Sequence, residues 1–365
     1  MNAGGLQWRR LPLLMLGALG LVTGLWAGLA RLGIAAAPLS PLAHGPLMVS
    51  GFLGTVISLE RAVAARATWA FAGPLCCGMG TVALLLGQPE FGAALLTAGS
   101  AVVVIVLTRV LVKEPVLHHG VLVVAALSWL LGNGLLLRGK PVFVVVWPWV
   151  LFLVGTIAAE RLELTRVLPR SRSAVVLFLL AFGAMTLGVV MGEVRVLFAG
   201  ALGLAAWLLR FDLARRTVRQ HGLVRFIAVA LLLGYGWLAI AGGLGLTFGN
   251  PIAGPRYDAL LHATFVGFVF SMIFGHAPII VPAVLGVRVP FHPRFYVHLV
   301  LLHASLVLRL TGDLFDDFAL RRAGSWGNVI AIALFIASTA AATAQGRSRE
   351  PRLRSGVVHP EPEQQ

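Results

Sequence analysis

The chain has 365 residues, of which 58% are hydrophobic and only 12% are charged, and its mean hydropathy is +0.90. Soluble domains carry about 25% charged residues, so this composition excludes a soluble globular protein and indicates a multi-pass membrane protein. The formal net charge of +15 would suit a nucleic-acid partner, but the distribution of the basic residues favours another explanation.

Twelve apolar stretches are long enough, or nearly so, to cross the hydrocarbon core of a membrane as helices. In chain order they are residues 11–30, 44–60, 70–87, 91–112, 119–137, 141–158, 174–192, 194–209, 226–248, 258–285, 295–312 and 325–344. We therefore predict an all-α polytopic fold with about 12 transmembrane helices.

No soluble domain interrupts these stretches, which predicts one transmembrane helical domain over residues 11–345, preceded by a cytoplasmic N-terminus at residues 1–10. Residues 346–365 are rich in Pro, Arg and Glu, a composition typical of disorder. We expect them to form a disordered cytoplasmic tail.

The basic residues alternate between the two sides of the predicted bundle very unevenly. With the N-terminus inside, the inner segments hold 21 Arg and Lys residues and the outer segments hold seven. This excess follows the positive-inside rule and predicts that both termini are cytoplasmic, in a bacterial inner (plasma) membrane. The basic charge therefore reflects topology, and we expect membrane lipids as partners and no nucleic acid.

A short sequence pattern occurs twice near the predicted cytoplasmic boundary. Residues 54–66 read GTVISLERAVAAR and residues 155–166 read GTIAAERLELTR, each with Glu-Arg at the end of a stretch. The pattern suggests an internal duplication, which is common in membrane proteins of several functions. The simpler interpretation is that both Glu-Arg pairs only finish a span at the interface.

Two histidines in the tenth stretch are the most informative feature of the chain. His262 and His276 lie fourteen residues apart in an apolar segment. In a regular α-helix this spacing returns to within about 40° of the same face after a rise of about 21 Å. Because a histidine in hydrocarbon is costly without a partner, we interpret both residues as candidate metal ligands.

The predicted topology pairs each of these residues with others at the same depth. His44 opens the second stretch on the outer side, level with His262, and His119 and His298 lie on the inner side with His276. Haem iron takes two axial ligands, which imidazoles from different helices can provide. We therefore predict an outer haem, of b type, between His44 and His262. A second, inner haem would use His276 with His119 or His298.

Other residues fit a haem site less specifically. Candidate cations for the haem propionates are Arg309, Arg321 and Arg322, and glycines that would leave room for the macrocycle are Gly45, Gly51, Gly54, Gly267 and Gly275. Membrane helices also use glycine for close packing. Methionines at helical spacing, Met48 and Met272, make copper possible, although methionine in a membrane helix usually serves packing.

Twelve spans with histidines at the outer ends of the second and tenth resemble the catalytic subunit of haem-copper oxidases and nitric oxide reductases. The segments HGPLMVSGFLG at 44–54 and LHATFVGFVFSMIFGHAP at 261–278 are more similar still to the NnrS family, which has twelve spans, contains haem and copper, and is linked to nitric oxide stress. The resemblance implies haem binding and a role in electron transfer, gas sensing or the nitrosative-stress response, with a possible redox partner protein.

The chain departs from the oxidases at the copper site. The oxidases carry a histidine in the sixth span and a histidine pair in the seventh, whereas the corresponding stretches here contain none, and position 264 in the tenth span is Thr264. The resemblance therefore does not imply terminal oxidase activity.

Two other functions are compatible with the sequence. Pro278 and Pro282 interrupt the tenth stretch, as in the broken helices of transporters, and intramembrane histidines would suit a proton-coupled multi-pass transporter. Few carboxylates lie within the spans to couple transport, however. A non-catalytic assembly factor is the third possibility, because the sequence lacks a complete catalytic set.

Overall fold

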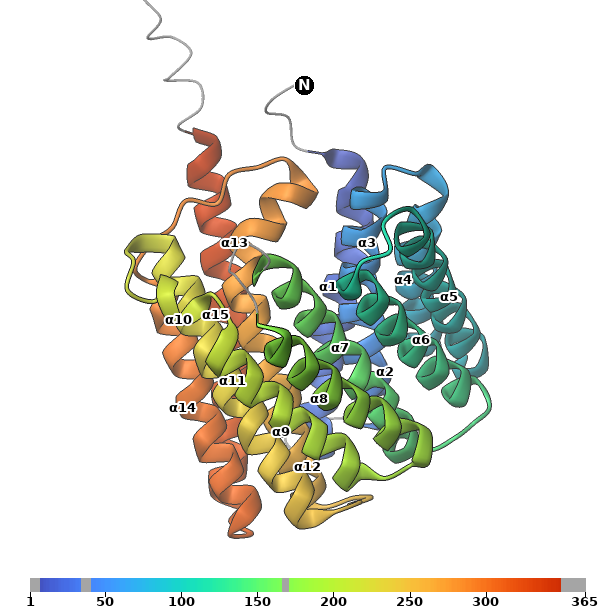
Figure 1. Ribbon diagram of the computed structural model, residues 1–365, viewed down its shortest axis with the longest axis vertical. Coiled ribbons are helices and arrows are strands. Elements are labelled where there is room, and N and C mark those ends of the chain that lie inside the picture. Colours follow the sequence, from blue (N-terminus) through green and yellow to red (C-terminus); the bar gives the residue numbers. More distant parts are fainter. Residues whose placement is uncertain (1–6, 34–40, 166–170, 349–365) are drawn as a thin grey trace, which may run out of the picture.

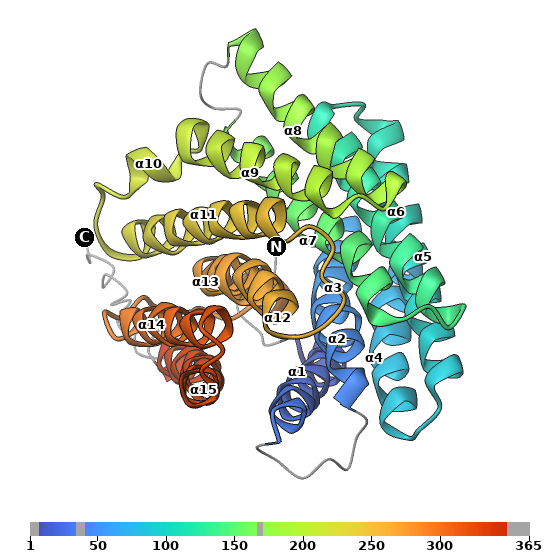
Figure 2. The ribbon, with the colours of Figure 1, turned by 90° about the horizontal axis from the view of Figure 1, so that it is seen from below.

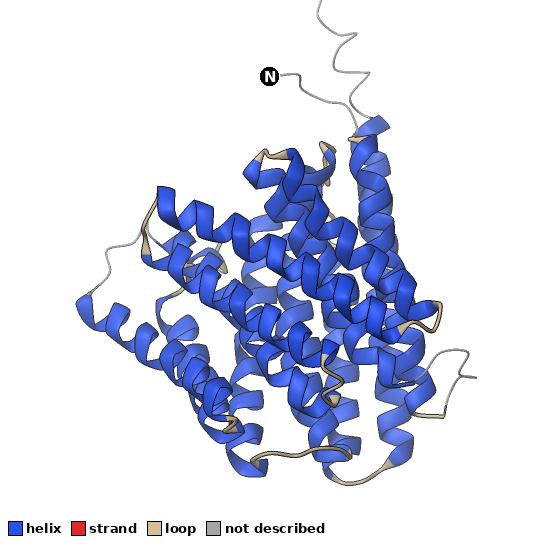
Figure 3. Cartoon of the chain, turned by 90° about the vertical axis from the view of Figure 1, so that its right-hand side faces the viewer, coloured by secondary structure: helices blue, strands red, loops and turns tan. Residues whose placement is uncertain are grey.

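The computed structural model describes residues 7–33, 41–165 and 171–348 (Figure 1). Within these ranges every secondary-structure element is a helix (Figure 3), and twelve helical runs are long and apolar enough to cross a membrane. The predicted all-α, twelve-span fold is therefore confirmed. The last helix continues to Ser348, and the rest of the predicted tail lies outside the described residues.

Ten of the spans are built on one α-helix each. They are α1 (Leu11–Arg31), α4 (Ala72–Leu85), α5 (Pro89–Lys113), α6 (Leu117–Leu137), α7 (Val142–Leu164), α8 (Arg172–Met191), α9 (Val194–Phe211), α11 (Gly222–Phe248), α14 (Phe295–Leu314) and α15 (Phe318–Ser348). A short helix, α10 (Ala214–Thr217), connects α9 to α11.

The second and tenth spans change helix type along their length. The second runs through α2 (His44–Pro46), the π-helix η3 (Leu47–Leu53) and α3 (Gly54–Ala65). The tenth runs through α12 (Pro255–His262), the π-helix η6 (Ala263–Phe270) and α13 (Ser271–Leu285). These are the two spans that carry the outer pair of predicted haem ligands.

Short loops make consecutive helices antiparallel neighbours, as in the pairs α4–α5, α5–α6, α6–α7, α8–α9 and α14–α15. Seen from below in Figure 2, the α12–η6–α13 run lies between α11 and the α14–α15 pair. Helix α7 is the most enclosed span, with Trp149 and Phe152 fully buried. Glycines allow close approach between helices: a Cβ at Gly200 in α9 would lie only 2.5 Å from the Met185 backbone nitrogen in α8.

The two ends of the bundle are distinct in Figure 1. Helix α1 begins and α15 ends at the upper end, which we call the terminal face. The turn between α14 and α15, together with α12, lies at the lower end, which we call the distal face. An even number of spans places the two ends of the described chain on the same side, as the sequence predicted.

The repeated Glu-Arg pattern is more than two separate span ends, because its copies contact each other. Arg61 of the first copy forms an ion pair with Glu160 of the second. Arg161 of the second copy donates from Nε and Nη2 to both oxygens of Asp212, at 2.8 and 2.9 Å, where α9 ends. The pattern thus joins α3, α7 and α9 by charge pairs inside the protein.

Removing one partner of the Arg161–Asp212 pair should destabilise the fold strongly. The Asp212 side chain is fully buried, so Arg161→Met leaves an unpaired carboxylate in the interior, at a cost of about 3–5 kcal/mol. Thermal unfolding in detergent would measure the loss. Arg210→Met, an exposed arginine of α9, is the matched control and should change the midpoint little. An unfolding midpoint for Arg161→Met equal to that of the control would contradict a stabilising role for the pair.

Candidate functional site

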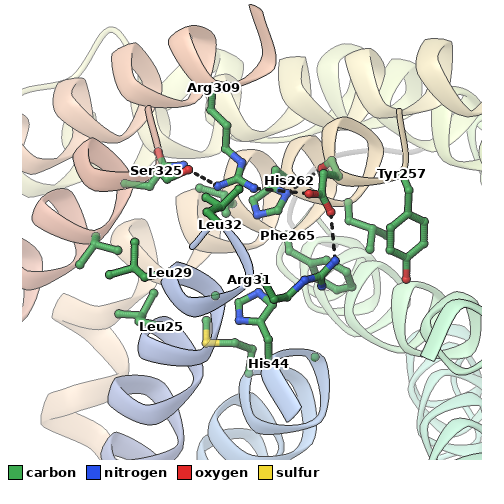
Figure 4. A pocket seen from close by; sticks show the side chains of 18 of the residues that line it. Leu25, Leu29, Arg31, Leu32, His44, Tyr257, His262, Phe265, Arg309 and Ser325 are labelled. Carbon is green, nitrogen blue, oxygen red and sulfur yellow. Dashed lines mark hydrogen bonds and ion pairs between the residues drawn. The ribbon is translucent and has the colours of Figure 1, made fainter. Parts of the chain in front are cut away.

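His44 and His262, predicted as one ligand pair, line a single cavity (Figure 4). The cavity has a volume of about 450 Å³ and lies toward the distal face, with walls from α1, α2–η3, α7, α12–η6, α14 and α15. This volume is within the range of sites for small molecules and cofactors. His44 and His262 are 218 positions apart in the sequence, and the fold brings them into one site.

Both imidazole rings are held in the same way. His44 Nδ1 lies 2.7 Å from the Gly24 carbonyl oxygen, and His262 Nδ1 lies 2.6 Å from the Asp258 carbonyl oxygen. A carbonyl oxygen only accepts hydrogen bonds, so Nδ1 must carry the hydrogen in each ring. The neutral ring then keeps a free lone pair on Nε2. A backbone carbonyl that fixes Nδ1–H is the usual support of a metal-binding histidine.

A π-helix follows each of these histidines, which the sequence analysis did not predict. The side chains of Met48 and Val49 in η3, and of Phe265 and Val266 in η6, line the cavity. Phe52 and Phe270 bring the two π-helices together, with ring centroids 6.2 Å apart. π-Helical segments are rare and are often found at functional sites. No residue pattern in either segment announces the change in helix type.

The π-helix η6 also corrects the predicted relation between His262 and His276. The spacing argument assumed a regular α-helix, but eight residues between the two histidines have the wider π turn, which changes their relative orientation. His262 lines the cavity and His276 does not. The Nδ1 of His276 donates to the Met272 carbonyl at 2.7 Å, while its Nε2 is buried without a hydrogen-bond partner.

The three residues predicted for an inner haem have different surroundings. His298 packs among Phe274, Phe295 and Phe335, with Ser338 bonded to its Nδ1 at 3.2 Å. His119 bonds the Glu114 carbonyl through Nδ1 at 2.8 Å at an exposed position. No interaction joins either residue to His276 in the described part of the chain, so His298 is best explained as part of an aromatic cluster.

The arginines predicted to bind the haem propionates do not all line the cavity. Arg309 and Arg321 line the cavity, whereas Arg322 is exposed and does not. Two further charged residues of the site were not among the predicted ligands, Arg31 and Asp258. In the sequence, only their positions at the ends of the first and tenth apolar stretches could have indicated that they belong to the site.

These charged groups form a network at the distal end of the cavity, and Figure 4 shows its Arg31 and Arg309 members. The Asp258 carboxylate lies 3.5 Å from Arg31 Nη2 and 3.9 Å from Arg309 Nη2. Asp313 pairs with Arg309 at 3.8 Å and with Arg321 at 2.7 Å. The exposed carboxylate of Asp316 also lies 3.2 Å from Arg321 Nη2. Three guanidinium groups thus face three carboxylates, and the N–H donors of Arg309 and Arg321 at the cavity wall suit an anionic group.

Only one of the glycines predicted to leave room for a macrocycle does so. Gly45 lines the cavity. The space beside Gly51, Gly54, Gly267 and Gly275 is taken by neighbouring residues of other helices, Thr81, Trp129, Trp237 and Ala230 respectively. Those four glycines therefore serve helix packing, and the interpretation of them as haem-facing residues was wrong.

A family model described as "Domain of unknown function (DUF8744)" matches residues 10–344, so the chain belongs to this family. No curated protein and no solved structure matched the chain. Among the described residues, no group of three or more His, Cys, Asp and Glu side chains is arranged to hold a metal ion. A haem requires only two protein ligands at its iron.

Asp258 should stabilise the distal end of the cavity by balancing two arginines. In Asp258→Asn the amide cannot neutralise Arg31 and the largely buried Arg309, so we expect a loss of roughly 1–3 kcal/mol in stability, the cost of leaving a charged group poorly satisfied. Thermal unfolding in detergent measures it. Glu193→Gln, at an exposed position outside the cavity, is the control and should unfold like the unmodified protein. If Asp258→Asn also unfolds like the unmodified protein, Asp258 contributes nothing to stability.

Proposed function

We propose that this member of the DUF8744 family is a haem-binding protein of the bacterial inner (plasma) membrane. His44 and His262 would be the axial ligands of one b-type haem near the distal face. The observation that carries the proposal is the shared orientation of the two rings: each Nδ1–H is bonded to a backbone carbonyl, and both side chains line the same cavity. Both Nε2 lone pairs are therefore available for coordination without any change of tautomer.

The walls and charges of the cavity suit the amphipathic shape of a haem. Leu25, Leu29, Phe265 and Val266 provide apolar contact, which the porphyrin ring needs. Arg309 and Arg321 at the distal end provide charged N–H donors for propionate carboxylates. Arg31, which shares Asp258 with Arg309, adds a third cation.

When bound, a haem with two histidine ligands supplies one-electron transfer. The protein would hold the ring orientations through the Gly24 and Asp258 carbonyls, and the apolar walls would exclude water from the iron. With both His44 and His262 holding the iron, the site would favour electron transfer over the reduction of a bound gas. A role in electron transfer linked to nitric oxide or nitrosative stress is consistent with the resemblance to the NnrS family.

Terminal oxidase activity does not fit the residues of the sixth and seventh spans. Helices α7 and α8 contain no histidine, so the copper ligands of the oxidases have no counterpart there. Thr264, at the position of the second oxidase histidine, instead donates its hydroxyl to the Leu260 carbonyl at 2.9 Å.

The histidine assignment predicts a haem spectrum that depends on both ligands. Protein purified from haem-replete cells should show a Soret band with the α and β bands of a low-spin iron. His44→Ala and His262→Ala should each lose or shift that band, because each removes one axial ligand. Absorption spectra before and after reduction provide the measurement.

Two other histidines act as controls for the spectrum. His221→Ala changes an exposed histidine and should leave the spectrum unchanged. His276→Ala should also leave it unchanged if only the outer haem is present, and should remove part of the absorbance if an inner haem exists. Folded, colourless wild-type protein would disprove the proposal.

A substitution beside His44 should disturb the site without removing a ligand. A Cβ at Gly28 would lie 2.9 Å from Cε1 and 3.0 Å from Nδ1 of the His44 ring, so the side chain in Gly28→Val must displace that ring. We expect a weaker or shifted Soret band in the folded variant. Gly183→Val, at a helical glycine with nothing within 4 Å of a Cβ, should have the wild-type spectrum. Equal spectra for both variants would contradict ligation by His44.

A further inference from the structure

Arg294 is a partly buried cation at the terminal face, and two of its guanidinium nitrogens have no acceptor. It lies in the loop between α13 and α14, where it is the residue preceding α14. Its Nε and Nη2 atoms are enclosed, and neither has a hydrogen-bond partner. Because an enclosed guanidinium without an acceptor is costly, these atoms indicate an anion that belongs at this position.

Aromatic contacts hold this loop against the start of α11. The Phe226 ring lies 6.0 Å from that of Phe291, 5.8 Å from that of Phe295 and 5.3 Å from that of Tyr296. These three residues lie on either side of Arg294 in the sequence. In Figure 1 the loop accordingly runs beside the beginning of α11, near α10. Arg294 therefore lies close to the connection between α9 and α11.

That connection adds positive charge and no free carboxylate. Its three arginines, Arg215, Arg216 and Arg219, are exposed, and so is Arg225 in the first turn of α11. Its single acidic residue, Asp212, is fully buried and already binds Arg161 and the Ala214 backbone N–H. The sequence has no Asp or Glu from residue 213 to 257, from 259 to 312, or from 318 to 348. The described residues around Arg294 thus offer no anion of their own.

The position of the site relative to the membrane identifies the class of anion. Arg294 directly precedes the span of α14, so we expect it at the depth of lipid headgroups, and the exposed side chains of Val297 and Val300 follow it along α14. A planar guanidinium binds the oxygens of a phosphate well. Basic pockets between transmembrane helices at the cytoplasmic side typically bind anionic headgroups.

We propose that Arg294, supported by Arg225, binds the phosphate of an anionic phospholipid, with an acyl chain lying along Val297 and Val300. The exposed arginines nearby favour an anionic lipid over a zwitterionic one, because a choline group would add a positive charge to a surface that already carries several. This site is separate from the cavity of His44 and His262, at the opposite end of the bundle, and does not depend on haem binding.

Lipid titration of the delipidated full-length protein in detergent tests the proposal. Dioleoyl phosphatidylglycerol should bind and raise the thermal unfolding midpoint more than dioleoyl phosphatidylcholine does, and native mass spectrometry should detect the bound lipid. Arg294→Gln should weaken phosphatidylglycerol binding about fivefold, because one basic residue contributes about 1 kcal/mol to the attraction of anionic lipid. Arg322→Gln, an exposed arginine beyond the opposite end of the bundle, should bind it like the wild type.

Other results of the lipid titration would overturn the proposal or assign the site to a different anion. Equal binding of the two lipids, or wild-type phosphatidylglycerol binding by Arg294→Gln, would overturn the proposal. Inorganic phosphate that stabilises the wild type as well as the lipid would assign the site to a free anion instead. If Arg294→Gln does not fold, Arg225→Gln and Arg294→Lys take its place. The lysine variant keeps the charge but loses the planar fork, so both should bind phosphatidylglycerol more weakly than Arg322→Gln.

Discussion

The structure depends on one constraint: a polar side chain between the two membrane faces must find its partner within the protein, because hydrocarbon offers none. Several buried residues of this chain meet that requirement in detail. Asn133 accepts from Ser50 and from the indole of Trp149, and donates to the Leu96 carbonyl. The Arg161–Asp212 and Arg61–Glu160 pairs do the same for charged groups. Polar interactions thus specify which helices are neighbours where apolar packing alone would be less selective.

Atoms that lack a partner are therefore informative. The rings of His44 and His262 are each satisfied at Nδ1 and open at Nε2, and both line a cavity that has arginines at one end. Arg294 has no acceptor at the opposite face, beside several exposed arginines. These two sites differ in the chemistry that would complete them, since imidazole lone pairs suit a metal and guanidinium groups suit a phosphate.

The two π-helices connect the fold to the first of these sites. Each follows one of the paired histidines, each contributes side chains to the cavity wall, and the two meet through Phe52 and Phe270. A wider turn moves the residues beyond it to a different face of the helix. His262 lines the cavity, and His276, fourteen residues further along the same span, lies outside it with its own backbone hydrogen bond. A second haem between His276 and either His119 or His298 is correspondingly less well supported than the outer one.

The sequence by itself determined the twelve helical spans, the common side of the two chain ends and the shared depth of His44 and His262. Spans follow from the length of apolar segments, and depth follows from counting residues from the span ends, so both are local properties of the chain. Only the tertiary structure showed where the π-helices lie and that most of the glycines serve packing. It also showed the contact between the two Glu-Arg copies and the places of Arg31 and Asp258 in the site. Those features depend on which helices meet and at what rotation, and that is set by side-chain contacts between segments far apart in the sequence.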